Sequence, residues 1–217
     1  MKKRHYVLII LPVVVLVVIL AIYLRRGPEN PKPSEDVESA PNSGAFTRVD
    51  TATEDKTLSQ LFEELGIVQI EPLAIPVDVT LPDLNGRQVR LPDFKGKVIF
   101  LNFWTTWCPP CREEMPAMEK LHRWLKHKAF IMVAIDMQEP ASKVEAFFKE
   151  YKLTFMALLD SSGEVGLLFG IRSIPTTLIL DKNGMIIGIA IGPRDWADKK
   201  SIALFEYLID QEVELTS

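Results

Sequence analysis

The stretch Val98-Ile-Phe-Leu-Asn-Phe-Trp104, followed directly by Thr105-Thr-Trp-Cys-Pro-Pro-Cys111, decides the fold of this chain. Its first seven residues are almost all apolar, which is typical of a central strand that is buried on both faces. Between Met115 and Leu125, apolar side chains recur every three or four residues and predict a helix that runs to about His127. The sequence therefore predicts a buried strand that passes into a helix through Cys-Pro-Pro-Cys.

The segments on either side of this core alternate between strand and helix patterns. Asn85-Gly86, between the alternating apolar residues of 77–81 and 89–91, predicts a β-hairpin. The capping-box spacing of Ser142 and Glu145 predicts the start of a further helix. Strands are expected at 130–135, 155–159, 176–180 and 185–191, and helices at 164–169 and about 197–209. This order predicts an α/β fold in which helices flank a mixed sheet.

The two cysteines of the chain, Cys108 and Cys111, stand where the predicted strand passes into the helix. At the N-cap, the sulfur of Cys108 would face free backbone N–H groups and the positive end of the helix dipole, which favour the nucleophilic thiolate. Cys111 lies one turn further on, within reach of a disulfide. We therefore expect a redox dithiol in which Cys108 attacks a substrate disulfide and Cys111 resolves the mixed disulfide.

Other uses of such a cysteine pair fit the sequence less well. A structural zinc ion needs four ligands, and no second pair of cysteines or histidines is placed to supply them. Covalent haem attachment needs Cys-x-x-Cys-His, whereas Arg112 follows Cys111. A permanent structural disulfide stays open as an alternative, although so short a loop stabilises little. We expect neither a metal ion nor another cofactor.

Beyond the dithiol, the chain resembles the thioredoxin superfamily, specifically the membrane-anchored TlpA/ResA-like thiol–disulfide oxidoreductases. The resemblance covers about residues 70–212 and rests on the motifs Asp83-Leu-Asn-Gly86, Gly96-Lys-Val-Ile-Phe-Leu-Asn-Phe-Trp104, Trp107-Cys-Pro-Pro-Cys-Arg-Glu-Glu-Met-Pro116, Ile174-Pro-Thr-Thr177 and Asn183-Gly184. It implies a thioredoxin-like fold with an N-terminal β-hairpin extension, and an enzyme that acts on protein disulfides. It also suggests apocytochrome c as one substrate, and a membrane electron donor of the CcdA or DsbD kind.

The resemblance assigns roles to residues around the dithiol. Pro175 matches the family's cis-proline, which would leave the backbone of Ile174 free to pair with an extended substrate segment; the alternative is an ordinary turn proline. Glu114 matches a glutamate that ResA-like members place near the dithiol, where it could relay protons or set the cysteine pKa values. The alternative is a solvated carboxylate beside Glu113. Trp107 is expected to cover part of the site.

Other residues near the motif receive structural interpretations. Ordinary thioredoxins carry a buried aspartate six residues before the first cysteine, but Asn102 stands there, as in ResA-like members. Because an amide cannot exchange a proton, that task would pass to Glu114, to water or to no group. Trp104 is expected in the core, Pro116 is expected to kink the helix, and the histidines at 122 and 127 are expected on the surface.

The two prolines between the cysteines predict the redox potential of the cysteine pair. Pro109 suits the first helical position, and Pro110 at the second has no N–H, so the N–H of Cys111 is the local donor that remains for the Cys108 thiolate. A less stabilised thiolate makes a more reducing couple. We therefore expect a reductant nearer the ~ −270 mV of thioredoxin than the ~ −120 mV of the oxidant DsbA.

The N-terminal segment has the properties of a membrane anchor. Residues 7–24 form a run of 18 residues without a charge, about 27 Å long as a helix. No small-residue cleavage site follows, so we favour an uncleaved anchor over a cleaved signal peptide. Three basic residues precede the run and two follow it, which places the N-terminus in the cytoplasm and the body outside. We thus expect a single-pass protein of the bacterial inner membrane whose soluble domain faces the periplasm or the cell exterior.

Composition and charge support this division of the chain. Residues 1–26 carry a charge of +5, whereas the remainder carries −9, which argues against nucleic acid as a partner. Residues 27–66 are rich in proline and acidic side chains and are interpreted as a tether that ends in a short helix over 58–65. The thioredoxin-like domain is expected over 67–217.

Two other functions are known on related folds. A thiol peroxidase of the peroxiredoxin type would present Pro-x-x-x-Thr-x-x-Cys; Thr105 fits this motif, but Leu101 stands at the proline position. A Sco-like copper chaperone would space its cysteines by three residues and add a distant histidine. Here the spacing is two residues, and the last 90 residues contain no histidine. Both alternatives are therefore less favoured than disulfide exchange.

Overall fold

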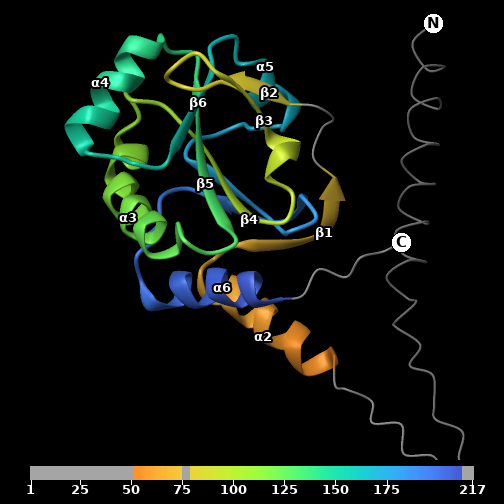
Figure 1. Ribbon diagram of the computed structural model, residues 1–217. Coiled ribbons are helices and arrows are strands. Elements are labelled where there is room, and N and C mark those ends of the chain that lie inside the picture. Colours follow the sequence, from red (N-terminus) through yellow and green to blue (C-terminus); the bar gives the residue numbers. More distant parts are fainter. Residues whose placement is uncertain (1–50, 75–78, 212–217) are drawn as a thin grey trace, which may run out of the picture. The chain divides into compact units, whose positions relative to one another are not determined.

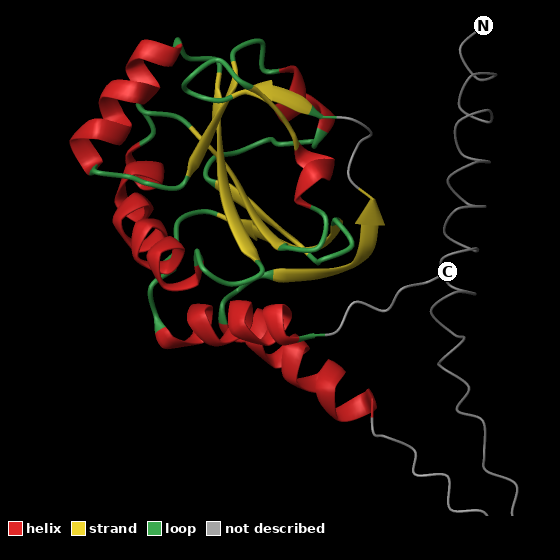
Figure 2. Cartoon of the chain, in the orientation of Figure 1, coloured by secondary structure: helices red, strands yellow, loops and turns green. Residues whose placement is uncertain are grey.

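The computed structural model describes residues 51–74 and 79–211, all of which belong to one unit of the chain, residues 49–217. The helices are α2 (Thr51–Glu64), the 3-10 helix η1 (Leu91–Phe94), α3 (Pro109–Leu125), α4 (Ala141–Tyr151), α5 (Glu164–Leu168) and α6 (Lys199–Asp210). The strands are β1 (Val68–Ala74), β2 (Thr80–Pro82), β3 (Gln88–Arg90), β4 (Val98–Trp104), β5 (Phe130–Met137), β6 (Met156–Asp160), β7 (Thr176–Leu180) and β8 (Met185–Ile191). Figures 1 and 2 show their arrangement.

Six of these strands form one mixed sheet in the order β1-β8-β7-β4-β5-β6. The neighbours β4, β5 and β6 are parallel, whereas β7, β8 and β1 join through antiparallel pairs. Strands β2 and β3 form a separate hairpin, in which Leu81 is opposite Val89. The predicted α/β class, the mixed sheet and the hairpin extension are therefore confirmed, and the fold is thioredoxin-like.

Strand β4 is central because it is apolar on both faces, and all seven of its side chains are buried. Its even-numbered residues, such as Phe100, pack with α2, α3, α4 and α6, and its odd-numbered residues, such as Leu101, pack with the hairpin, η1 and α5. Figure 2 shows the sheet between these two layers. Since side chains alternate along a strand, a seven-residue apolar run is what two covered faces require.

The structure differs from the sequence prediction at two helix starts. Helix α2 begins at Thr51, seven residues before the predicted start, because the polar residues 51–57 carry no apolar spacing that could reveal it. The predicted capping box is wrong: α4 begins at Ala141 after Pro140, without a side-chain cap, so Ser142 lies inside the helix.

The sequence reading also missed β1, which forms one edge of the sheet. Val68 and Ile70 alternate with Gln69 and Glu71, but Pro72 interrupts this short run, and all side chains of β1 are exposed apart from the half-buried Ile70. Its pairing with β8 is irregular, with a register shift between Gln69 and Leu73.

No helix within residues 51–74 and 79–211 is long and apolar enough to cross a membrane. The predicted anchor at 7–24 and residues 27–50 of the predicted tether lie outside the residues that the structure describes.

Candidate active site

The two cysteines lie where β4 passes into α3. Cys108 is the N-cap of α3, and a disulfide joins it to Cys111, with their Cα atoms 5.3 Å apart. Cys108 is 3% exposed, whereas Cys111 is completely buried. The structure thus holds the oxidised pair, with Cys108 as the cysteine that solvent can reach.

The local capping geometry is the one predicted from the two prolines. Pro109 and Pro110 occupy the first turn of α3, and the main-chain N–H of Cys111 donates to the sulfur of Cys108 at 3.3 Å. The sulfur of Cys108 therefore accepts a hydrogen bond from one main-chain N–H of the first turn, because Pro110 has no N–H.

Trp107 and the proline segment lie at the same pocket. The peptide bond between Ile174 and Pro175 is cis, as the resemblance predicts. Trp107 is 66% exposed, and the half-buried Ile174 packs against the apolar cluster that contains both cysteines. Both line a pocket of about 220 Å³, together with Thr105, Met137, Gln138, Ile171, Arg172 and Ser173. The structure therefore brings Trp107 and Ile174, two of the three residues predicted to bind substrate, to one pocket, and Pro175, the third, follows Ile174 directly.

Glu114 is a buried acid rather than a solvated surface carboxylate. It lies one turn after Cys111 on α3 and is 2% exposed, whereas its neighbour Glu113 faces solvent. Its Oε1 accepts a hydrogen bond from the amide of Asn102 at 3.0 Å. Its Oε2 accepts from the indole N–H of Trp196 at 3.0 Å and from the main-chain N–H of Arg194 at 3.2 Å.

These surroundings place the ionisation of Glu114 near neutrality. Burial raises the pKa of Glu114 to about 7, while the hydrogen bonds from Trp196, Asn102 and Arg194 and the charge of Arg194 act in the opposite direction. The carboxyl group therefore changes charge in the pH range in which disulfide exchange operates, as a group that exchanges protons must.

Asn102 connects the central strand to this acid. Its amide N–H₂ donates to Glu114 and also, at 2.9 Å, to the hydroxyl of Thr177 on β7. The sequence identified Asn102 and Glu114 separately but did not predict their contact. It did not identify Trp196 or Arg194 at all, because they lie about 80 residues further along the chain and belong to no recognised motif.

A second pair of buried acids, also missed, lies next to the segment that precedes Cys108. Glu139 accepts hydrogen bonds from the main-chain N–H of Thr106 at 2.5 Å and from its hydroxyl at 2.8 Å, and so fixes that segment. Burial, and then the neighbouring Glu139, raise the pKa of Asp136 to about 8. The available signal was an acid at the carboxyl end of an apolar strand, where sites in α/β folds gather.

Among the structural predictions around the motif, those for Trp104 and His127 are confirmed and that for His122 is wrong. Trp104 is fully buried, Pro116 lies inside α3, and His127 is exposed. His122, by contrast, is half-buried with its ring edge against Phe155, and burial lowers the pKa of its imidazole. It lies on the helix face next to the sheet, which a spacing argument without a partner could not reveal.

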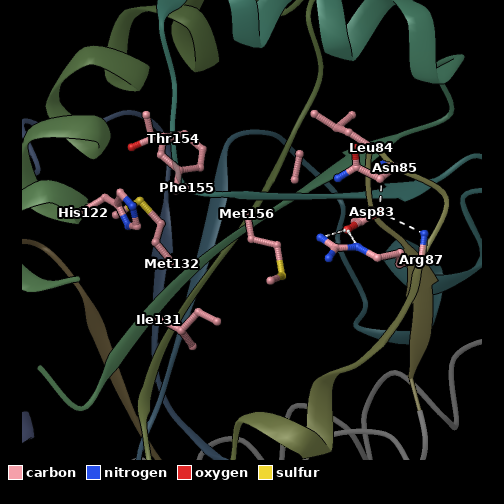
Figure 3. Close-up of a pocket in the computed structure, with 11 residues that line it drawn as sticks. Asp83, Leu84, Asn85, Arg87, His122, Ile131, Met132, Thr154, Phe155 and Met156 are labelled. Carbon is pink, nitrogen blue, oxygen red and sulfur yellow. Dashed lines mark hydrogen bonds and ion pairs between the residues drawn. The ribbon is translucent and has the colours of Figure 1, made fainter. Parts of the chain in front are cut away.

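His122 lines a larger pocket of about 390 Å³ at the β6 edge of the sheet. Figure 3 shows His122 on one side of this pocket and, on the other, Asp83, whose carboxylate accepts hydrogen bonds from Asn85 and Arg87. None of the predicted site residues lines it. Among the described residues, no group of three or more His, Cys, Asp or Glu side chains could hold a metal ion.

Comparison with known proteins agrees with this fold and this cysteine pair. A family model described as the AhpC/TSA family matches residues 74–189, a little over half of the chain, so the chain belongs to this family. Its curated relatives include proteins named thiol-disulfide oxidoreductase ResA. That of Geobacillus thermodenitrificans is 40% identical over 123 residues, which cover 57% of this chain and 71% of the relative.

That of Bacillus thuringiensis subsp. konkukian is 43% identical over 105 residues, 48% of this chain. The chain spans about three fifths of that relative, 61% of its length. Among solved structures, StoA from Bacillus subtilis is similar with a TM-score of 0.52 and 31% identity, over 62% of this chain and 98% of StoA. A putative thiol:disulfide interchange protein DsbE from Chlorobium tepidum is similar with a TM-score of 0.57 and 27% identity, over 64% and 99%.

The buried position of Glu114 predicts the effect of removing its charge. Above about pH 7, wild-type Glu114 is a buried anion one turn from Cys111, and an anion there disfavours a cysteine thiolate. Glu114→Gln should therefore abolish the inflection near pH 7 in the rate at which the reduced protein reacts with iodoacetamide, and should react faster than wild type above that pH. Glu113→Gln, the exposed neighbour, is the matched control and should keep the wild-type profile. An unchanged profile in Glu114→Gln would exclude this role.

Proposed function

We propose that this chain is an extracytoplasmic thiol–disulfide oxidoreductase that reduces disulfides in protein substrates. The observation that carries the proposal is the Cys108–Cys111 disulfide at the start of α3, with an open pocket at Trp107 and Ile174 on one side and the buried Glu114 one turn further on. The names of its relatives, thiol-disulfide oxidoreductase ResA, support the same reaction class.

The reaction uses the two cysteines in order. In the reduced protein, the Cys108 thiolate attacks one sulfur of the substrate disulfide, forms a mixed disulfide and releases the other substrate sulfur as a thiolate. The Cys111 thiolate then attacks the sulfur of Cys108 and releases the second substrate thiolate. Two electrons pass from the dithiol to the substrate, which leaves the Cys108–Cys111 disulfide. The greater exposure of Cys108 suits it to the first attack.

Glu114 can accept and return the proton that these steps require. Cys111 must lose a proton before it attacks, and an acid that ionises at about pH 7 one turn away can accept that proton, directly or through water. When a donor reduces the disulfide again, the same carboxyl group can return the proton. Asn102 cannot exchange a proton itself, but its hydrogen bond at 3.0 Å holds the carboxyl group in place.

The substrate class follows from the pocket and the family. An unfolded or extended segment could pair its backbone with Ile174 and place an apolar side chain against Trp107, as in the addition of a strand. Apocytochrome c, during cytochrome c maturation, is the substrate that the TlpA/ResA resemblance favours. A membrane protein of the CcdA or DsbD kind would then supply electrons, which requires the domain to be held at the membrane by residues 7–24.

Trapping tests the order of attack. In Cys111→Ala, the mixed disulfide at Cys108 cannot be resolved, so it should accumulate with substrate proteins and be identified by mass spectrometry after non-reducing separation. Cys108→Ser is the control and should trap nothing and fail to reduce insulin. If Cys111→Ala traps no protein while the wild type consumes hydrogen peroxide, a peroxidase replaces this proposal.

The capping geometry predicts the redox potential of the pair. Because Pro110 leaves the Cys111 N–H as the first-turn donor to Cys108, the thiolate is weakly stabilised, and the potential of the couple should lie nearer the ~ −270 mV of thioredoxin than the ~ −120 mV of DsbA. Equilibration against dithiothreitol or glutathione buffers measures it. Pro110→Ala restores a donor and should move the potential upward; a wild-type value above about −180 mV, that of an isomerase, would contradict the argument.

The proposed topology has a direct test. Protease added to intact spheroplasts should digest the body of the chain, residues 60–217, because the charge distribution around residues 7–24 predicts that the body lies outside the cytoplasm. A cytoplasmic protein serves as the control for intact membranes. Protection of the body would contradict the orientation, and a mature chain that begins near residue 27 would contradict the anchor.

A further inference from the structure

Arg194 fastens the segment between β8 and α6 to the turn between α2 and β1. Its guanidinium donates to the carbonyl oxygens of Leu65 at 2.9 Å and Gly66 at 2.6 Å in that turn. It also donates to the carbonyl oxygens of Ile191 at 3.2 Å and Gly192 at 2.9 Å. The five N–H groups of a guanidinium form a rigid, planar set of donors, so one side chain can bind two chain segments at once.

The segment that Arg194 fastens is the one that covers Glu114. The main-chain N–H of Arg194 and the indole N–H of Trp196 both donate to Glu114. The Arg194 guanidinium lies over the Trp196 ring, 5.8 Å from its centroid. The outer side of the segment is open to solvent at a hollow of about 300 Å³, lined by Glu113, Glu114, Ala117, Pro193, Arg194 and Asp195. Glu114 itself lines this hollow but is only 2% exposed, and the donors from the segment, the Arg194 N–H and the Trp196 indole N–H, both bind its Oε2.

We propose that Arg194 is a positioning residue that holds this segment closed and keeps water away from the carboxyl group of Glu114. The proposal rests on the role of Glu114 in the proposed function. It makes the turn between α2 and β1 part of the active-site architecture. A lysine in place of Arg194 could supply the charge but not the planar set of donors.

Arg194 acts on Glu114 in two opposite directions. The charged groups that line the same hollow as Glu114 are Glu113, Arg194 and Asp195, while Cys111, one turn away, is held in the disulfide and does not titrate in the oxidised chain. Strands β4 and β7 present neutral groups, Asn102 and Thr177. The positive charge of Arg194 lowers the pKa of Glu114, whereas burial beneath the segment raises it and is the larger cause. In a variant without Arg194, the change in the pKa of Glu114 from loss of burial should therefore exceed the change from loss of the positive charge.

The test measures the titration of Glu114 in the oxidised full-length chain by carbon NMR of labelled glutamate carboxyl groups, with Glu114→Gln to assign the signal. In both Arg194→Gln and Arg194→Lys, the pKa of Glu114 should fall by about one unit or more from its value of about 7, because water reaches the carboxyl group. The main-chain N–H at position 194 should also exchange faster with deuterium in both variants.

Lys200→Gln is the matched control. Lys200 binds Glu64 at 3.0 Å, so it also ties α2 to the rest of the fold, but it makes no hydrogen bond to the segment that covers Glu114 among those in the described residues. Its loss should leave the titration of Glu114 unchanged. The comparison therefore separates the fastening of this one segment from a general loosening of α2.

Two outcomes would overturn the proposal. If Arg194→Gln raises the pKa of Glu114 while Arg194→Lys leaves it unchanged, Arg194 acts through its charge alone. If both variants lower the melting temperature without moving the titration, Arg194 has a merely structural role. Because the titration uses no substrate, it is independent of the trapping experiment, and a failure of the proposed function would show there instead.

Discussion

The position of the dithiol depends on β4. A strand that is paired on both edges and packed on both faces cannot shift along its axis without moving the entire core, so the point at which the chain leaves it is fixed. Cys108 lies four residues beyond that point, at the first turn of α3. Asn102, the polar residue of this strand, is held to the same position and reaches Glu114 from it. One strand therefore sets the places of both the cysteine pair and the acid.

The site balances burial against hydrogen bonding. Glu114 receives enough donors to remain inside the protein as an anion, yet burial keeps the neutral acid accessible near pH 7. Its donors come from Asn102 on β4 and from Arg194 and Trp196 in the segment between β8 and α6, two parts of the chain that are far apart in the sequence. The chemistry of the carboxyl group is thus a property of the assembled fold, and no local segment could reproduce it.

This explains which parts of the site could be predicted from the sequence. The dithiol, its capping and the hairpins depend on residues close together in the chain, and local patterns predicted them correctly. The sequence singled out Glu114, but its burial could not be established, because on α3 it stands beside the exposed Glu113 and only tertiary contacts distinguish the two. Arg194 and β1 were missed for the same reason: their roles come from the segments they contact rather than from their own pattern.

The irregular edge strand β1 has a consequence for how this protein meets other polypeptide chains. A regular edge would offer a ladder of free N–H and C=O groups to any extended polypeptide, and such pairing leads to aggregation. In β1 the register shift between Gln69 and Leu73, together with Pro72, which has no N–H, and the charge of Glu71, interrupts that ladder. An extended polypeptide therefore finds no continuous template at this edge of the sheet, whereas the cysteines lie beyond the carboxyl end of the central strand β4.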